Sequence, residues 1–201
     1  MMDLVLSDTY WKCQLPPGSS GDVTIEKFEV KAVAEQELNQ DPNPVPGWAR
    51  RQPGWYTRLI IGTTIMMTDL YEEWWSQRQA IHEARTRGGN VLISGLGLGL
   101  ILDAILKPED SLVTRVTVLE KNPDVIQLVA PYFLQKYPDK LTIIQSDALA
   151  WSPPENAHYQ VVWHDIWPYP LLVPQEEIDC LHDKFAGRSE WQGFWTEASF
   201  E

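Results

Sequence analysis

An apolar run that passes directly into alternating glycines is the most informative stretch of the chain: residues 91–100 read V91-L-I-S-G-L-G-L-G-L100. The apolar residues predict a buried strand, and a helix is expected from Leu98 to Leu106. Glycines let the backbone turn sharply and approach a ligand, and the amino end of the helix offers free N–H groups. We therefore interpret Gly95, Gly97 and Gly99 as the cofactor loop of an α/β nucleotide-binding fold.

The spacing of these glycines bears on the identity of the nucleotide. The dinucleotide fingerprint is G-x-G-x-x-G, which would place a glycine at position 100. This sequence has Leu100 there, and its third glycine, Gly99, falls one place early. The spacing therefore argues against NAD.

Downstream of the glycines, strand-like and helix-like segments alternate. The expected strands are 91–94, 113–119, 141–144, 159–163 and one more around 191–195, and the expected helices are 98–106, 123–132 and 174–185. Such alternation indicates a parallel sheet with helices on its faces. The predicted fold is α/β, a Rossmann-like parallel sheet with helices on both faces, and it occupies residues 68–201.

The segment before this pattern, residues 1–67, is predicted to be a small N-terminal β region. Its expected elements are a strand at 23–30, a hairpin formed by 56–61 and 63–67 around Gly62, and a proline-rich loop at 41–54. A helix over 69–87 joins the two regions, with Thr68 or Asp69 as its N-cap and Gly88 at its end. Its apolar stripe consists of Leu70, Trp74, Ile81 and Ala84.

Ligands of open α/β sheets bind beyond the carboxyl ends of the strands, so the residues that follow each strand are candidate site residues. Glu120 follows the second strand and can accept hydrogen bonds from ribose hydroxyls; a solvated acid is the alternative interpretation. Asp147 follows the third strand and can accept from an adenine amino group, and the same residue type also suits a helix N-cap.

The fourth strand ends in W163-H-D-I-W-P-Y169. Asp165 lies where the reacting end of a cofactor would be, and it can act as a base or orient an acceptor amine. The alternative is that Asp165 only ends the strand, with Pro168 and Pro170 fixing the turn. His164 precedes Asp165 and is expected to point the other way in an extended segment.

Taken in order, these motifs resemble those of the class I S-adenosylmethionine-dependent methyltransferases, and among them the spermidine-synthase-like branch. The resemblance covers roughly residues 55–170 and is carried by VLISGLGLGL, VTVLEKNPDVI, IIQSDALAW and YQVVWHDIWP. It implies S-adenosylmethionine as the cofactor. It also implies a role for each strand-end residue: Gly95, Gly97 and Gly99 near the methionine part, Glu120 at the ribose, Asp147 at adenine and Asp165 at the reaction site, with Lys121 and Ala148 as further cofactor-binding residues.

Two features of the sequence depart from that family. Only residues 166–201 follow Asp165, so a shortened sheet is expected, with an acceptor pocket that is truncated, rebuilt from the N-terminal region or borrowed from another subunit. The Asp-x-x-Asp pattern of aminopropyl transfer is also missing, because Pro168 stands where the second acid would be.

The leading functional hypothesis is methyl transfer to an unidentified small-molecule acceptor. The alternatives are an aminopropyltransferase that uses the decarboxylated cofactor, and a non-catalytic module that binds S-adenosylmethionine.

Composition limits the classes of molecule that this protein is expected to bind, and it also bears on its location and oligomeric state. The chain of 201 residues has a formal net charge of −12, which disfavours nucleic acid and tolerates a cationic cofactor. No apolar run approaches the roughly 18 residues of a membrane span, and the first residues lack a secretory pattern, so a cytoplasmic protein is expected. Cys13 and Cys180 fit no metal or disulfide pattern. Ten tryptophans and the edges of a short sheet favour a homo-oligomer.

Overall fold

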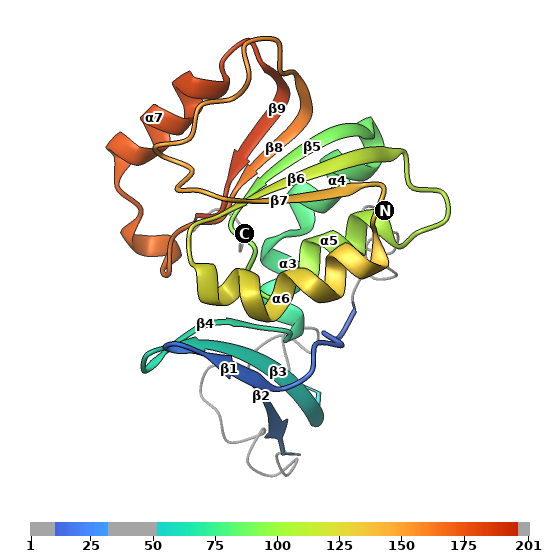
Figure 1. Ribbon diagram of the computed structural model, residues 1–201, viewed down its shortest axis with the longest axis vertical. Helices are drawn as coiled ribbons and strands as arrows, with labels where there is room; N and C mark the ends of the chain where they lie inside the picture. Colours follow the sequence, from blue (N-terminus) through green and yellow to red (C-terminus); the bar gives the residue numbers. More distant parts are fainter. Residues whose placement is uncertain (1–10, 32–51, 197–201) are drawn as a thin grey trace, which may run out of the picture.

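The computed structural model describes residues 11–31 and 52–196, and these form two sheets with helices around them (Figure 1). The smaller sheet is antiparallel and has the order β1-β2-β3-β4. Its strands are β1 (Gly18–Ser20), β2 (Val23–Val30), β3 (Gly54–Ile61) and β4 (Thr64–Thr68). The predicted hairpin around Gly62 is confirmed as β3 and β4. Residues 41–51 of the predicted proline-rich loop lie outside the described residues.

The larger sheet is parallel throughout and has the order β7-β6-β5-β8-β9. Its strands are β5 (Gly89–Ser94), β6 (Val113–Glu120), β7 (Leu141–Gln145), β8 (Tyr159–His164) and β9 (Ser189–Phe194). The chain builds outward from β5 through β6 to β7, then crosses to the other side of β5 to form β8 and β9. This reversal makes the space between the carboxyl ends of β5 and β8 the topological switch point, where doubly wound folds bind ligands.

Helices cover both faces of the parallel sheet, as predicted. They are α3 (Tyr71–Ser76), α4 (Arg78–Arg87), α5 (Leu100–Leu106), α6 (Pro123–Lys136) and α7 (Gln175–Phe185), with a 3-10 turn, η2, at Pro170–Leu172. Val91 and Ile93 of β5 pack in one core with α4, α5 and α6, whereas Leu92 packs in a second core with Leu181 and Phe185 of α7. Successive residues of a strand point to opposite faces, which explains this division.

The single helix predicted over 69–87 is in fact two helices that meet at Gln77. The Gln77 N–H donates to the carbonyl of Trp74, and its φ and ψ of −90° and −3° interrupt the α-helical path. Neither predicted cap residue caps α3 with its side chain. Instead, the buried Asp69 carboxylate accepts from the backbone N–H groups of Cys13, which precedes β1, and of Thr57 in β3.

The antiparallel sheet packs against the parallel domain through α6, which lies between the two sheets in Figure 1. Ser20 donates to the Asp124 carboxylate of α6 over 2.6 Å. Met67 of β4 reaches the glycine loop, where its sulfur accepts from the N–H of Leu98 at 3.1 Å. The end of the smaller sheet is thereby fixed over the switch point of the larger one. Within the described residues, no helix has both the length and the apolar character needed to cross a membrane.

Candidate active site

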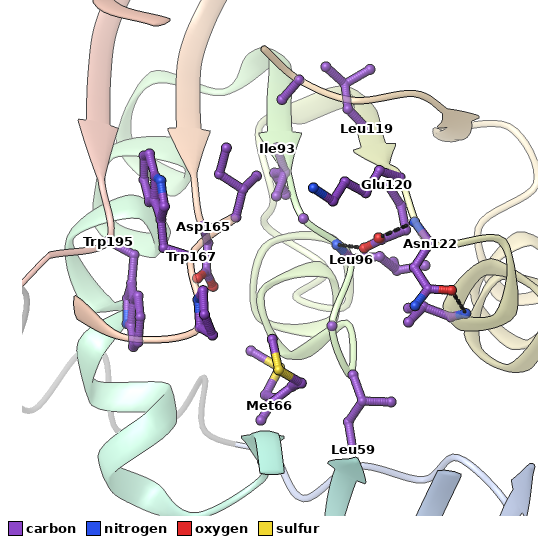
Figure 2. A pocket seen from close by; sticks show the side chains of 18 of the residues that line it. Leu59, Met66, Ile93, Leu96, Leu119, Glu120, Asn122, Asp165, Trp167 and Trp195 are labelled. Atoms are coloured by element: carbon purple, nitrogen blue, oxygen red, sulfur yellow. Dashed lines mark hydrogen bonds between the residues drawn. The ribbon is translucent and has the colours of Figure 1, made fainter. Parts of the chain in front are cut away.

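A cavity of about 540 Å³ opens at the carboxyl ends of the parallel strands (Figure 2). One side, here named the strand-end wall, consists of Gly95–Gly97, Leu119–Asn122 and Ser146–Leu149. The opposite side, here named the hairpin wall, consists of Leu59, Ile61, Met66 and Met67 of the small sheet with Glu73 and Gln77. Trp163, Asp165 and Trp195 line the cavity beside β8.

The glycine loop forms the base of the strand-end wall. Gly95, Gly97 and Gly99 all have positive φ angles, of 99°, 50° and 70°. A side chain on Gly95 would meet the backbone of Asp165, and one on Gly97 would meet the sulfur of Met67, so both positions require glycine. Gly99 does not line the cavity; it lies at the start of α5, against the ring of Phe133.

Glu120 lines the cavity and also holds the loop in place. One carboxylate oxygen accepts from the N–H of Leu96 at 2.9 Å, and the other accepts from the N–H of Asn122 at 2.8 Å (Figure 2). A carboxylate oxygen has a second lone pair, so both oxygens can still accept from a ligand. Neither sequence interpretation of Glu120 included this structural role, which joins the glycine loop to the start of α6.

The other predicted residues of this wall lie beside Glu120. Lys121, Asp147 and Ala148 all line the cavity. The Lys121 ammonium is 3.9 Å from the Asp147 carboxylate, and both side chains are well exposed, at 73% and 43%. Asp147 accepts from the N–H of Leu149 at 2.9 Å in a turn. No helix follows it, so the helix-cap interpretation is wrong.

Asp165 follows β8 and faces the cavity between Trp167 and the glycine loop (Figure 2). Its Oδ2 accepts from the amide of Gln77 at 2.7 Å, and the Gln77 carbonyl accepts from the Trp163 indole, also at 2.7 Å. Burial raises the pKa of Asp165 to about 7; the Gln77 hydrogen bond lowers that pKa and the charge of Glu120 raises it. A carboxyl group with this pKa can take up or release a proton near neutral pH.

His164 points away from the cavity, as expected from the alternation of side chains along a strand. Gln192 donates its amide N–H to Nε2 of His164 at 3.0 Å, so Nδ1 carries the proton and donates to the Ser94 hydroxyl at 2.9 Å. Burial, together with the charge of Lys184, lowers the pKa of His164 to about 3. The imidazole is therefore a neutral, structural group.

Sequence reasoning missed two polar residues of the hairpin wall, Glu73 and Gln77. Both fall on the predicted apolar stripe of the helix, beside Trp74 and Ile81. Polar residues at such positions are a signal that could have identified them. Burial, together with the charges of Asp165 and Glu72, raises the pKa of Glu73 to about 8, against the lowering effect of the Thr68 N–H.

Comparison with known proteins adds a likeness of fold. No family model and no curated protein matches the chain by sequence. Among solved structures, spermidine synthase from Thermotoga maritima is 18% identical, with 85% of this chain and 52% of that one covered and a TM-score of 0.47. The 23S rRNA methyltransferase ErmE is 19% identical, with 56% and 43% covered and a TM-score of 0.42. DhpI, solved as a complex with SAM and HEP, is 21% identical, with 59% and 53% covered and a TM-score of 0.43. The chain thus spans about half the length of these proteins.

Proposed function

We propose that this protein binds S-adenosylmethionine in the cavity and transfers a methyl group to a small molecule. The observation that carries the proposal is the character of the cavity at the switch point. A glycine loop forms its base, and five carboxyl groups line it: Glu73, Glu120, Asp147, Asp165 and Glu177. Among the described residues that line the cavity, Lys121 is the only cation. This charge suits a sulfonium cation and opposes the two phosphates of a dinucleotide.

The residues present fit the cofactor part by part. Gly95 and Gly97 let the ligand approach the loop backbone where a Cβ could not be placed. Glu120 presents carboxylate lone pairs for ribose hydroxyls, and Asp147 with the backbone of Ala148 presents groups suited to an adenine edge. The bound cofactor supplies an electrophilic methyl group that needs no further activation.

The protein itself has to align the acceptor and manage its proton. Asp165 lies at the end of the cavity next to the loop and has a pKa close to neutral. We assign it the role of accepting the proton that an acceptor loses. Gln77 fixes the orientation of the Asp165 carboxylate through one hydrogen bond and is itself fixed by Trp163.

Isothermal titration calorimetry of the full chain tests the proposed cofactor. S-adenosylmethionine and its demethylated product are expected to bind and NAD is not. Glu120→Ala is expected to weaken binding about tenfold or more, because a hydrogen bond to a charged group contributes roughly 1.5–3 kcal/mol. Asp139→Ala, an exposed acid outside the cavity, is the matched control. The absence of binding by both S-adenosylmethionine and its product would refute the proposal.

Since Glu120 also holds the loop, a second variant is needed. Asp147→Ala removes a half-exposed carboxylate and one turn hydrogen bond, and it is expected to weaken cofactor binding with little loss of stability. Thermal unfolding of each free variant separates the two effects. Methyl transfer would then be sought with a panel of small acceptors. Turnover of putrescine with the decarboxylated cofactor would show that the activity is aminopropyl transfer and not methyl transfer. Cofactor binding without turnover of any acceptor would show that the protein is a binding module.

A further inference from the structure

Two carboxyl groups from distant parts of the chain line the same cavity. Asp165 comes from the end of β8, and Glu73 comes from α3, before the parallel sheet begins. The two groups lie close enough to each other for the charge of Asp165 to raise the pKa of Glu73. Two carboxylates placed together in a poorly solvated site repel each other and hold a proton at neutral pH.

Surrounding contacts fix where these two groups lie. Gln77 is hydrogen-bonded to both Trp163 and Asp165. The preceding residue, Ser76, donates to the backbone carbonyl of Glu73 at 2.7 Å and accepts from the Trp195 indole at 2.9 Å. The junction between α3 and α4 is thereby tied to β8 and to the residue after β9, which holds the backbone that carries Glu73 near Asp165.

The pair retains acceptor capacity that the described chain does not use. Within residues 11–31 and 52–196, no side chain donates to the Glu73 carboxylate, and the Oδ1 atom of Asp165 accepts no hydrogen bond. Lys121, the cation of the cavity, pairs with Asp147 in the strand-end wall. Both residues are only partly buried and line the cavity, so this acceptor capacity is open to a ligand.

Several large apolar side chains line the same cavity. Leu59, Ile61 and Met66 line it from the small sheet, and the rings of Trp163 and Trp195 line it beside β8. Figure 2 shows Leu59 and Met66 across the cavity from Glu120, with Trp195 on the side of Asp165. A ligand that matches this environment has one positively charged donor group on an apolar body.

We propose that Glu73 and Asp165 form the acceptor subsite and bind a primary monoamine with an apolar body, held as its ammonium ion between the two carboxylates. The inference rests on the proposed function, since it names the acceptor of that same site. Binding of the ammonium ion leaves both carboxylates ionised, so protons carried by the free pair pass to solvent. The ammonium can then give one proton to a carboxylate, which yields a carboxylic acid and a neutral amine with its lone pair available.

Other titratable groups lie beside Glu73 or line the same cavity, and they bear on the pH dependence of ligand binding. They are Glu72 beside Glu73, Glu120, Lys121 and Asp147 of the strand-end wall, Tyr169 after β8, and Glu177 of α7, which accepts from the Trp167 indole at 2.6 Å. Variants of Glu73 and Asp165 are therefore required to assign a proton release to this pair.

Calorimetry of the full chain without cofactor provides the test, with hexylamine, 1-hexanol, putrescine and MgCl₂ as probes. Hexylamine is expected to bind and to release about one proton at pH 7, counted by repeating the titration in buffers of different ionisation enthalpy. Its affinity is expected to rise at least about tenfold from pH 6 to pH 8, as the pair ionises. Hexanol is expected to bind weakly and release no proton, because its hydroxyl carries no charge.

Glu73→Gln and Asp165→Asn keep the shape of each side chain and remove its charge. Each is expected to weaken hexylamine binding at least about tenfold and to reduce the proton release, with Asp139→Asn as the control. Unchanged binding in both variants would overturn the proposal, as would equal affinity for hexanol, putrescine binding tighter than hexylamine, or proton-releasing binding of Mg²⁺. Hexylamine binding without S-adenosylmethionine binding would refute the proposed function alone. The converse result would refute only this inference.

Discussion

The two walls of the cavity are built in different ways. In the strand-end wall, Gly95, Glu120 and Asp147 each lie at the end of a strand or within two residues of it, and hydrogen bonds from backbone N–H groups hold the loops there. In the hairpin wall and its helical junction, the hydrogen bonds join distant parts of the chain. Gln77 is bonded to Trp163 and Asp165, which are 86 and 88 positions away in the sequence. Ser76 is bonded to Trp195, which is 119 positions away. The first wall follows from local sequence, whereas the second exists only once the whole domain has folded.

The largest expected effect tests the strand-end wall. Gly95→Ala places a methyl group against the backbone of Asp165 at a φ of 99°, and we expect a loss of about 3 kcal/mol or more of unfolding free energy. Gly187→Ala is the matched control, because it has a φ of 70° but open space around it, and its expected cost is about 1 kcal/mol. Chemical denaturation measures both. Equal costs would show that the close approach at Gly95 does not constrain the fold.

A second variant probes the long-range contacts of the hairpin wall. Gln77→Ala leaves the buried Trp163 indole N–H without its acceptor, and we expect a loss of about 2 kcal/mol. It also removes a hydrogen bond that lowers the pKa of Asp165, so that pKa is expected to rise further. Gln79→Ala, two residues on and exposed, is expected to be nearly neutral. A similar stability for both variants, measured by urea denaturation, would argue against a network that joins α3 and α4 to β8.

The pH dependence of stability tests the same region without a change of structure. The pKa values of Asp165 and Glu73 are raised on folding to about 7 and about 8, so the native state binds more protons than the unfolded state between roughly pH 4 and pH 8. These groups therefore favour the fold at low pH, and their contribution is lost as pH rises. His164 acts in the opposite sense, but only between its lowered pKa of about 3 and its ordinary 6.5.

Above pH 6.5 the two carboxyl groups are thus expected to dominate. Unfolding free energy should fall between pH 6.5 and pH 8.5, by at most about 1.4 kcal/mol per pH unit for each group. Glu73→Gln should make this fall shallower, whereas Asp139→Asn should not change it. Urea denaturation across this range is the measurement, and a flat profile for the unaltered protein would contradict the raised pKa values.

The smallest expected effect returns to the strand-end wall. Lys121→Ala removes an exposed cation 3.9 Å from Asp147, and we expect a change in unfolding free energy below about 0.5 kcal/mol. The same change makes the cavity more negative, so binding of the sulfonium cofactor is expected to tighten slightly. Calorimetry would detect this as a difference in cofactor affinity between Lys121→Ala and the unaltered protein, and the difference should be smaller at high salt than at low salt.

Much of the parallel domain could be predicted from sequence because its signals are local. The apolar runs and the glycines of the loop indicate the parallel strands of a ligand-binding sheet, and Gly95, Gly97, Glu120, Asp147 and Asp165 all line one cavity. Gly99 does not, because it serves the packing of α5 on Phe133. Its positive φ shows that a glycine can be needed for the turn alone.

The hairpin wall could not be predicted in the same way. The sequence predicts that Glu73 and Gln77 belong to one continuous helix, because helix propensity contains no information about tertiary hydrogen bonds. The break at Gln77 depends on Trp163 and Asp165, which are far away in the sequence. The use of Asp69 as a buried backbone acceptor similarly depends on Cys13 and Thr57.

The contact between Met67 and the glycine loop has a consequence for how this molecule can diversify. The wall that carries Met66 and Met67 belongs to a hairpin whose strand pairing lies entirely in the antiparallel sheet, while Glu120 and Asp147 depend on the register of the parallel one. Substitutions along β3 and β4 that spare Met67 can therefore reshape one half of the cavity and leave the other half in place. The architecture separates the part that can vary from the part that must be kept, and offers the hairpin as the natural segment for exchange.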